Sequence, residues 1–124
     1  MNPENLKYSK EHEWLQETGG GKVKVGITHF AQEQLGGLVF VNLPEVGDDV
    51  TQGEPFCDVE SVKAVSDVYS PVTGKVAAIN EELLDNPEKI NDDPYGAWFV
   101  EVEDIMETEE LLTAAEYTEF CKES

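Results

Sequence analysis

The chain is organised around the stretch Phe56-Cys57-Asp58-Val59-Glu60-Ser61-Val62-Lys63-Ala64-Val65-Ser66-Asp67-Val68-Tyr69. β-Branched and aromatic residues on both sides of Lys63 favour two strands with a half-buried surface. Residues 61–64 are then left as the tip between the strands. Because a strand anchors each side of this tip, we expect the Lys63 side chain to extend into solvent, where another enzyme can reach its amine.

A lysine at such a tip has two interpretations. It can simply keep a turn soluble, as charged residues in turns commonly do. It can also be a site of covalent attachment, which needs an accessible amine on a well-anchored backbone. After the hairpin the chain continues as Ser70-Pro71-Val72-Thr73-Gly74-Lys75-Val76, in which Gly74 predicts a second turn. These flanking residues favour the attachment site.

Length and charge limit the possible functions. A chain of 124 residues has a common size for one domain, and we expect a single domain over residues 1–124. The 27 acidic residues outnumber the 8 basic residues, so the formal net charge is −19. Such a surface repels nucleic-acid phosphates and anionic lipids, and we expect neither partner. It attracts basic surfaces of partner proteins, although acidity that only confers solubility is an equal alternative.

The two cysteines, Cys57 and Cys121, lie far apart in the sequence, with no Cys-x-x-Cys pair and no histidine at ligand spacing. We therefore expect no metal site, a reducing compartment, and thiols that pack as small core residues. No apolar run is long enough for a transmembrane helix or a secretion signal, and the N-terminus is not rich in arginine. This predicts a bacterial cytoplasmic protein, with a processed mitochondrial protein as the alternative.

The remaining segments predict short strands, tight turns and two helices. Strands are expected at residues 6–15, 22–27, 38–43, 75–80 and 97–103. The strand at 38–43 is apolar on both faces and should be buried, and Trp98 should lie on the buried face of the last strand. Thr28 should cap a short helix that ends at Gly36, and Thr113 and Glu116 fit a capping box for a C-terminal helix. Residues 86–96 should be irregular. The pattern predicts a mainly β barrel or sandwich with a short internal helix and a C-terminal helix.

The chain strongly resembles the H-protein family of the glycine cleavage system, whose members are small carriers with lipoic acid on a lysine. Besides the hairpin, the resemblance rests on Leu6-Lys7-Tyr8, His12-Glu13-Trp14, Gly26-Ile27-Thr28, Ala31-Gln32, Leu35-Gly36, Val39-Phe40-Val41, Leu43-Pro44, Asn91, Pro94-Tyr95-Gly96, Trp98, Leu111-Leu112-Thr113-Ala114 and Glu116-Tyr117. Each piece alone is weak, but the combination covers nearly the whole chain in order. The resemblance implies a barrel-sandwich hybrid, the lipoyl-domain architecture with extra terminal elements.

The same resemblance implies a function. Lys63 would carry lipoic acid through an amide bond, and the protein would be a monomeric carrier, not an enzyme. A pyridoxal-phosphate-dependent glycine decarboxylase would load an aminomethyl group on the arm, and a tetrahydrofolate-dependent aminomethyltransferase would unload it. A flavin-containing dihydrolipoamide dehydrogenase would then reoxidise the arm. A lipoate ligase, or a lipoyl or octanoyl transferase, would attach the lipoyl group.

Four further site residues follow from the resemblance. Glu60 and Ser61 would be recognised by the modifying enzyme, with the alternative that Glu60 merely offsets the charge of Lys63. Glu13 and Asp67 would line a cleft that protects the loaded arm, with carboxylates facing its ammonium group. The alternative is that these two acids are ordinary solvated side chains.

Rival functions remain open. The chain could be another swinging-arm domain, although a biotinyl site typically has Met on both sides of its lysine, where Val62 and Ala64 stand here. Lipoyl domains of 2-oxoacid dehydrogenase complexes usually belong to longer chains with linkers. An H-like relay that donates lipoyl groups to other enzymes is a further alternative. A hydrolase is not supported, because neither His12 nor His29 has a nearby Ser or Cys in a nucleophile pattern, and no catalytic residue is predicted.

Overall fold

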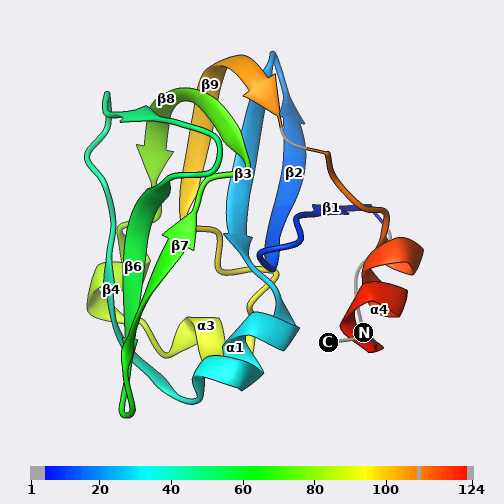
Figure 1. Cartoon of the computed structure of the whole chain (residues 1–124). Helices are drawn as coiled ribbons and strands as arrows, with labels where there is room; N and C mark the ends of the chain where they lie inside the picture. The colour runs from blue at the N-terminus through cyan, green and yellow to red at the C-terminus, as the bar shows by residue number, and fades with distance from the viewer. Residues whose placement is uncertain (1–4, 109, 123–124) are drawn as a thin grey trace.

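The structure is a computed structural model that describes residues 5–108 and 110–122. Its elements, in chain order, are β1 (Lys7–Tyr8), β2 (Glu13–Gly19), β3 (Lys22–Ile27), α1 (His29–Leu35), β4 (Leu38–Asn42), β5 (Asp49–Val50), β6 (Pro55–Ser61), β7 (Val65–Tyr69), β8 (Val72–Ile79), α2 (Glu82–Asp85), α3 (Lys89–Asp92), β9 (Val100–Thr108) and α4 (Ala114–Lys122). The described strands form a larger sheet in the order β1-β2-β3-β9-β8-β5 and a smaller sheet in the order β4-β6-β7. Figure 1 shows the two sheets facing one another, with α1 and α3 near one end and α4 beside β1.

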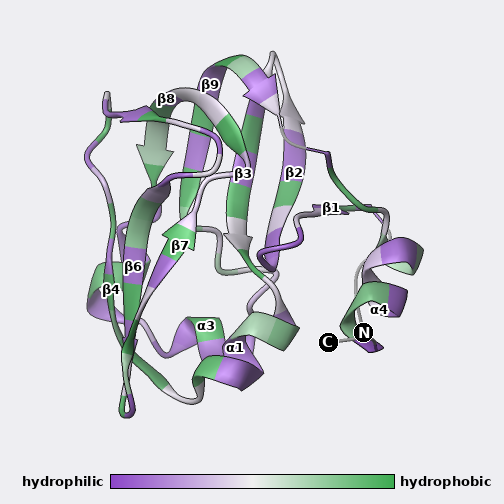
Figure 2. Cartoon of the chain, viewed as in Figure 1, coloured by the Kyte–Doolittle hydropathy of each residue, from purple (hydrophilic) through white to green (hydrophobic). Residues whose placement is uncertain are grey.

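Two hydrophobic clusters hold these elements together. The larger cluster combines buried residues from both sheets, including Val25, Val59, Val76 and Val100. Several strands are striped in green and purple in Figure 2, because alternate residues of a strand face the core and the solvent. The smaller cluster packs α4 and β1 around the Trp14 side chain. The result is the mainly β barrel-sandwich hybrid that the sequence predicted.

The predicted caps of the two helices are confirmed. The Thr28 hydroxyl accepts a hydrogen bond from the backbone N–H of Ala31 at 3.2 Å, so it caps α1, and α1 ends at Gly36 with a φ of 85°. The capping box of α4 is present, because Thr113 N–H donates to Glu116 Oε1 at 2.9 Å and Glu116 N–H donates to Thr113 Oγ1 at 3.2 Å. The helix ends are therefore determined locally.

The prediction that residues 38–43 form a strand buried on both faces is wrong. Strand β4 lies at the edge of the smaller sheet, paired with β6 alone, and its outer face is open. Val39 is 54% exposed and Phe40 is 48% exposed, while Leu38 and Val41 point into the core. An apolar sequence permits a strand to be buried on both faces, but each face is buried only where another part of the protein packs against it.

Gly74 does not form the predicted turn. It lies inside β8, which begins at Val72, three positions earlier than the strand expected at 75–80. A methyl group at Gly74 would lie 2.6 Å from the Glu103 backbone oxygen and 2.7 Å from Val102 Cγ1. Glycine is therefore needed here for the close approach of β9, and not for a change of chain direction.

Three other boundaries differ from the sequence prediction. Residues 6–15 contain two separate strands, β1 and β2, with a turn between them, and the expected irregular segment 86–96 includes helix α3 and follows α2. The last strand, β9, begins at Val100, so Trp98 precedes it and packs in the smaller cluster. The Lys24 ammonium lies 4.9 Å from the centre of the Trp98 ring.

Candidate functional site

The lysine hairpin has the predicted form. β6 and β7 pair in antiparallel register, with Glu60 opposite Val65, and residues 62–64 form the tip. The Ser61 hydroxyl accepts hydrogen bonds from the backbone N–H groups of Lys63 at 3.1 Å and Ala64 at 3.2 Å. Ser61 N–H in turn donates to the Ala64 carbonyl at 2.8 Å. Ser61 therefore shapes the turn that carries Lys63.

The Lys63 side chain is exposed and lies beside the C-terminal end of α1. A methyl group placed on Gly36, the residue that ends α1, would lie 3.8 Å from Lys63 Cε and 4.0 Å from Nζ. Within residues 5–108 and 110–122, Lys63 forms no ion pair. The amine is thus accessible and is not held by a carboxylate.

Glu60 lies at the centre of an exposed apolar surface next to the tip. It pairs with Phe40 of β4 on one side and with Val65 of β7 on the other. Val65 is 62% exposed and Val62 is 77% exposed. The alternative interpretation was that Glu60 only offsets the charge of Lys63. In the described part of the chain, Glu60 is half-buried with apolar neighbours and forms no ion pair with Lys63.

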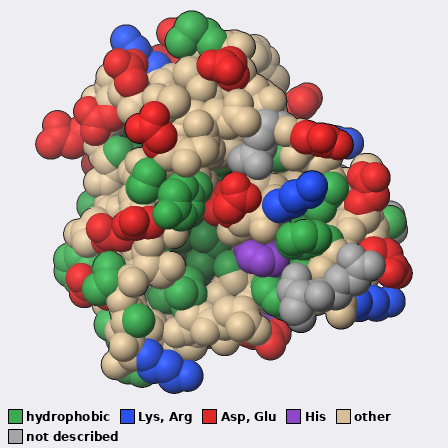
Figure 3. All heavy atoms as spheres, viewed as in Figure 1, with side chains coloured by type: hydrophobic (Ala, Val, Ile, Leu, Met, Phe, Trp, Pro, Cys, Tyr) green, Lys and Arg blue, Asp and Glu red, His purple; other side chains and the backbone are tan. Residues whose placement is uncertain are grey.

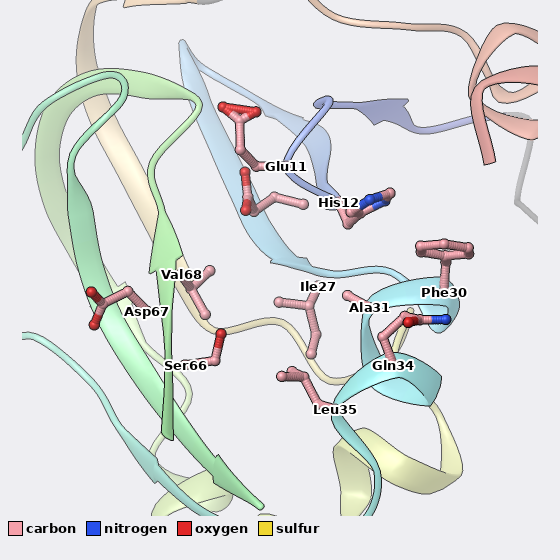
Figure 4. A pocket seen from close by; sticks show the side chains of 11 residues that line it. Glu11, His12, Ile27, Phe30, Ala31, Gln34, Leu35, Ser66, Asp67 and Val68 are labelled. Carbon is pink, nitrogen blue, oxygen red and sulfur yellow. The ribbon is translucent and has the colours of Figure 1, made fainter. Parts of the chain in front are cut away.

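A cavity of about 300 Å³ lies between α1, β7 and the start of β2. It is lined by Glu11, His12, Glu13, Ile27, Phe30, Ala31, Gln34, Leu35, Ser66, Asp67 and Val68. Figure 3 shows a hollow with hydrophobic side chains on this face of the molecule, and Figure 4 shows the lining side chains from close by. The cavity therefore combines an apolar wall with carboxylates.

Glu13 is not the solvated acid that was the alternative interpretation. Its side chain is only 3% exposed, and its Oε1 accepts a hydrogen bond from the Ser9 hydroxyl at 2.7 Å. The Glu13 backbone N–H donates to the same hydroxyl at 3.0 Å. Ser9 thus fixes the position of the Glu13 carboxylate at the start of β2. Glu13 is one of the residues that line the cavity.

Asp67 lies at the cavity rim with a different orientation. Ser66 and Val68 point toward the cavity in Figure 4, whereas the Asp67 carboxylate points away from it, toward β6. This is the alternation of a strand, in which successive side chains face opposite sides of the sheet. Asp67 pairs across the sheet with Asp58. The structure therefore places both predicted acids at the cavity, but the carboxylate of Asp67 points away from it.

His12 is a cavity residue that sequence reasoning did not assign. Its ring stacks on Phe30 with centroids 4.5 Å apart, and its Nδ1 lies 2.6 Å from the Tyr117 hydroxyl oxygen. Burial lowers the pKa of His12 below its ordinary value. Its backbone φ of 70° is uncommon for a residue with a side chain. No local pattern could have revealed the contact of His12 with Tyr117, because the two residues lie 105 positions apart in the sequence.

Cys57 has the environment of a core thiol. Cys57 is buried, and burial, followed by the nearby charges of Asp58, Glu13 and Asp67, raises the pKa of its thiol well above the ordinary value. A protonated, enclosed thiol is a poor nucleophile. In the part of the chain that the structure describes, no cluster of three or more His, Cys, Asp and Glu side chains could hold a metal ion. None of the described helices is long and apolar enough to span a membrane.

Comparisons with known proteins show the family of this chain. A family model described as the glycine cleavage H-protein matches residues 6–124. A glycine cleavage system H protein of Lachnoclostridium phytofermentans is 61% identical over 119 residues, which are 96% of this chain and 94% of that protein. Another from Bacillus cereus (strain AH187) is 56% identical over 124 residues, covering 98% of this chain and 97% of that protein. The crystal structure of a glycine cleavage system H protein from Mycobacterium marinum matches with a TM-score of 0.90 and 43% identity, over 97% of this chain and 98% of that one.

Proposed function

This chain belongs to the glycine cleavage H-protein family, and on that premise we propose that Lys63 carries its lipoyl group as an amide of the side-chain amine. The role of the protein is that of a lipoyl carrier in glycine cleavage. The observation that carries the proposal is the Lys63 amine, which is exposed and unpaired among the described residues at the tip of an anchored hairpin. When bound, lipoate supplies a strained cyclic disulfide that accepts an aminomethyl group and is reoxidised after release.

The residues around Lys63 present it to other enzymes without taking part in bond formation. Ser61 holds the turn through its two accepted hydrogen bonds, which keeps the Lys63 backbone at the outermost point of the hairpin. Glu60, flanked by the exposed Phe40 and Val65, offers a carboxylate within an apolar surface that the modifying enzyme can recognise. An apolar surface next to a charged group is a common recognition feature of protein surfaces.

The cavity beside α1 fits the arm that Lys63 would bear. Asp67 lies four positions after Lys63, a separation of at most about 14 Å along the chain, so a lysine stem with an acyl chain can reach from the tip to the cavity rim. The apolar wall of Ile27, Leu35 and Val68 suits a hydrocarbon chain. Glu13 supplies a fixed carboxylate that can pair with an ammonium group, and Asp67 adds negative charge at the rim.

We assign the carrier four kinds of partner on the same premise. Three act in turn on the arm: the pyridoxal-phosphate-dependent glycine decarboxylase, the tetrahydrofolate-dependent aminomethyltransferase and the flavin-containing dihydrolipoamide dehydrogenase. The fourth is the lipoate ligase, or the lipoyl or octanoyl transferase, that modifies Lys63. The net charge of −19 supports binding to basic surfaces on these enzymes. A bacterial cytoplasmic location is consistent with the sources of the similar proteins.

The attachment site is tested by intact-mass measurement and peptide fragmentation of the protein from lipoate-fed cells. We expect a lipoyl-sized addition on Lys63 that is absent from Lys63→Arg, which keeps the positive charge. Lys75→Arg is the matched control, because Lys75 is also an exposed lysine near a glycine but lies within a strand. An addition that persists in Lys63→Arg, or one of biotin size, would contradict the assignment.

The carrier role is tested separately by reconstitution. The lipoylated protein should support glycine-dependent exchange of CO₂ by the decarboxylase, and the unmodified protein and Lys63→Arg should not. A protein that is lipoylated on Lys63 but supports no exchange would be a relay of lipoyl groups, and the proposed role in glycine cleavage would be wrong.

A further inference from the structure

A chain of three side chains connects the arm cavity to the C-terminal helix. The Tyr117 hydroxyl lies 2.7 Å from Thr28 Oγ1 and 2.6 Å from His12 Nδ1. Thr28 and Tyr117 are both fully buried, and His12 lines the cavity. Thr28 is also the residue that caps α1, another wall of the cavity. The Tyr117 hydroxyl therefore joins three segments that are distant in the sequence.

The direction of these hydrogen bonds follows from the number of protons available. Thr28 Oγ1 already accepts the backbone N–H of Ala31 at 3.2 Å, so its own proton needs an acceptor, and the Tyr117 oxygen is the neighbour at hydrogen-bond distance. Tyr117 then donates its proton to His12 Nδ1. The reverse direction would leave the Thr28 proton without an acceptor in a fully buried position, which costs about 1–3 kcal/mol.

Cys121 offers the Tyr117 proton an alternative acceptor. Its thiol lies near enough to the Tyr117 hydroxyl to affect the pKa of Tyr117. A thiol sulfur is a weak acceptor, however, whereas an imidazole nitrogen at 2.6 Å is a strong one. The Tyr117 proton therefore goes to His12.

We propose that Tyr117 is a positioning residue that holds His12 in its neutral tautomer, with Nδ1 as acceptor and the proton on Nε2. His12 lines the cavity, so the cavity wall then presents an Nε2–H donor and no imidazolium charge that would repel a ligand bearing a cation. The inference rests on the proposed function, because the cationic ligand is the amine at the end of the loaded arm. It adds a condition for the specificity of the cavity: an ammonium group is accepted because the His12 ring beside it is uncharged.

Two further features of His12 support this assignment. The left-handed backbone at φ 70° is held from both sides, because His12 N–H donates to the Ser9 carbonyl at 3.1 Å and Thr28 N–H donates to the His12 carbonyl at 3.0 Å. Strained residues that are held by several bonds are concentrated at functional sites. The ring also stacks on Phe30 in a partly buried position, and burial lowers the pKa of His12, which favours the uncharged form.

The test is the tautomeric state of His12, measured by nitrogen-15 NMR of imidazole in the unmodified protein. We expect the Nε2–H tautomer in the wild type and in Thr28→Ser, which keeps the hydroxyl. In Tyr117→Phe, which keeps the ring stacked on Tyr8 with centroids 4.7 Å apart, the tautomers should mix and the pKa of His12 should rise. Tyr95→Phe is the matched control, because it also removes a phenolic hydroxyl, one that accepts a hydrogen bond from His29 N–H at 3.2 Å.

A second measurement separates positioning from general damage. The other titratable groups around His12 are Glu11, Glu13 and Asp67 in the cavity, with Tyr117 and Cys121 on α4. Relative to wild type, lipoylated Tyr117→Phe should support less CO₂ exchange at about pH 6, where more of its His12 is charged, and equal exchange at about pH 8. A loss of equal size at both pH values, an Nδ1–H tautomer in the wild type, or an unchanged tautomer in Tyr117→Phe would overturn the proposal. Because the NMR measurement uses unmodified protein, its result is independent of whether Lys63 is lipoylated.

Discussion

The substitution Gly26→Ala should strongly destabilise the protein, because Gly26 makes room for Trp14. The two residues are directly opposite one another on β3 and β2. A methyl group at Gly26 would lie 2.6 Å from Trp14 Cε2 and Cζ2 and 2.7 Å from Nε1. Carbon atoms in favourable contact are about 3.5–4.0 Å apart, so the indole would have to move by nearly 1 Å or more.

The indole cannot move freely, which determines the size of the effect. Trp14 is 1% exposed, and its Nε1–H donates to the Pro94 carbonyl at 3.0 Å. Overpacking of a core costs about 1–3 kcal/mol, and loss of the buried hydrogen bond adds about 1–3 kcal/mol. We therefore expect Gly26→Ala to lower the free energy of unfolding by about 2–6 kcal/mol, a large share of the roughly 5–15 kcal/mol that is typical of a domain.

Urea unfolding measures this difference, with Gly37→Ala as the matched control. No atom lies within 4 Å of a methyl group at Gly37, and its φ is not positive, so the control should be neutral or slightly stabilising. In a Trp14→Phe background, the smaller ring leaves space and the cost of Gly26→Ala should fall by about 1–2 kcal/mol. The steric explanation would be refuted if Gly26→Ala unfolded within about 0.5 kcal/mol of the wild type, or if its cost were the same in the Trp14→Phe background.

Two further predictions concern α4 and the cavity. Thr113→Ala removes the N-cap of α4 and should lower the free energy of unfolding by about 0.5–2 kcal/mol, as measured by urea unfolding; an unchanged midpoint would contradict the capping role. Burial lowers the pKa of His12 from its ordinary 6.5, so below that pH the unfolded chain binds the proton more readily than the folded one. The stabilising contribution of neutral His12 is therefore complete above the ordinary pKa of 6.5. As pH falls from there toward the lower pKa of His12 in the folded protein, the free energy of unfolding decreases by at most about 1.4 kcal/mol per pH unit. Unfolding curves at several pH values should therefore depend less on pH in His12→Asn, which tolerates the left-handed backbone; equal slopes in variant and wild type would contradict it.

Predictions from short stretches of sequence succeeded where the physical cause is itself local. Thr28 caps α1, and the Thr113 and Glu116 pair begins α4, because a capping side chain bonds to backbone groups only two or three positions away. The lysine hairpin follows from strand-forming residues on both sides of a short tip.

The incorrect predictions concern features whose cause lies in another part of the chain. Val39 and Phe40 looked like core residues, but β4 is an edge strand and no described element buries these two side chains. Gly74 looked like a turn residue, but it serves the close contact with Glu103 on the neighbouring strand. A residue type is compatible with several structural roles, and the neighbouring strand decides which of these roles the residue has.

The sequence by itself determined the family, the mainly β architecture and Lys63 as the candidate attachment residue, because these depend on local patterns and on a characteristic order of short motifs. Only the tertiary structure decided the cavity. Its walls come from β2, α1 and β7, and the bond between His12 and Tyr117 joins residues 105 positions apart. Such contacts form only when the sheets pack and α4 folds back onto β1, so no local pattern contains them.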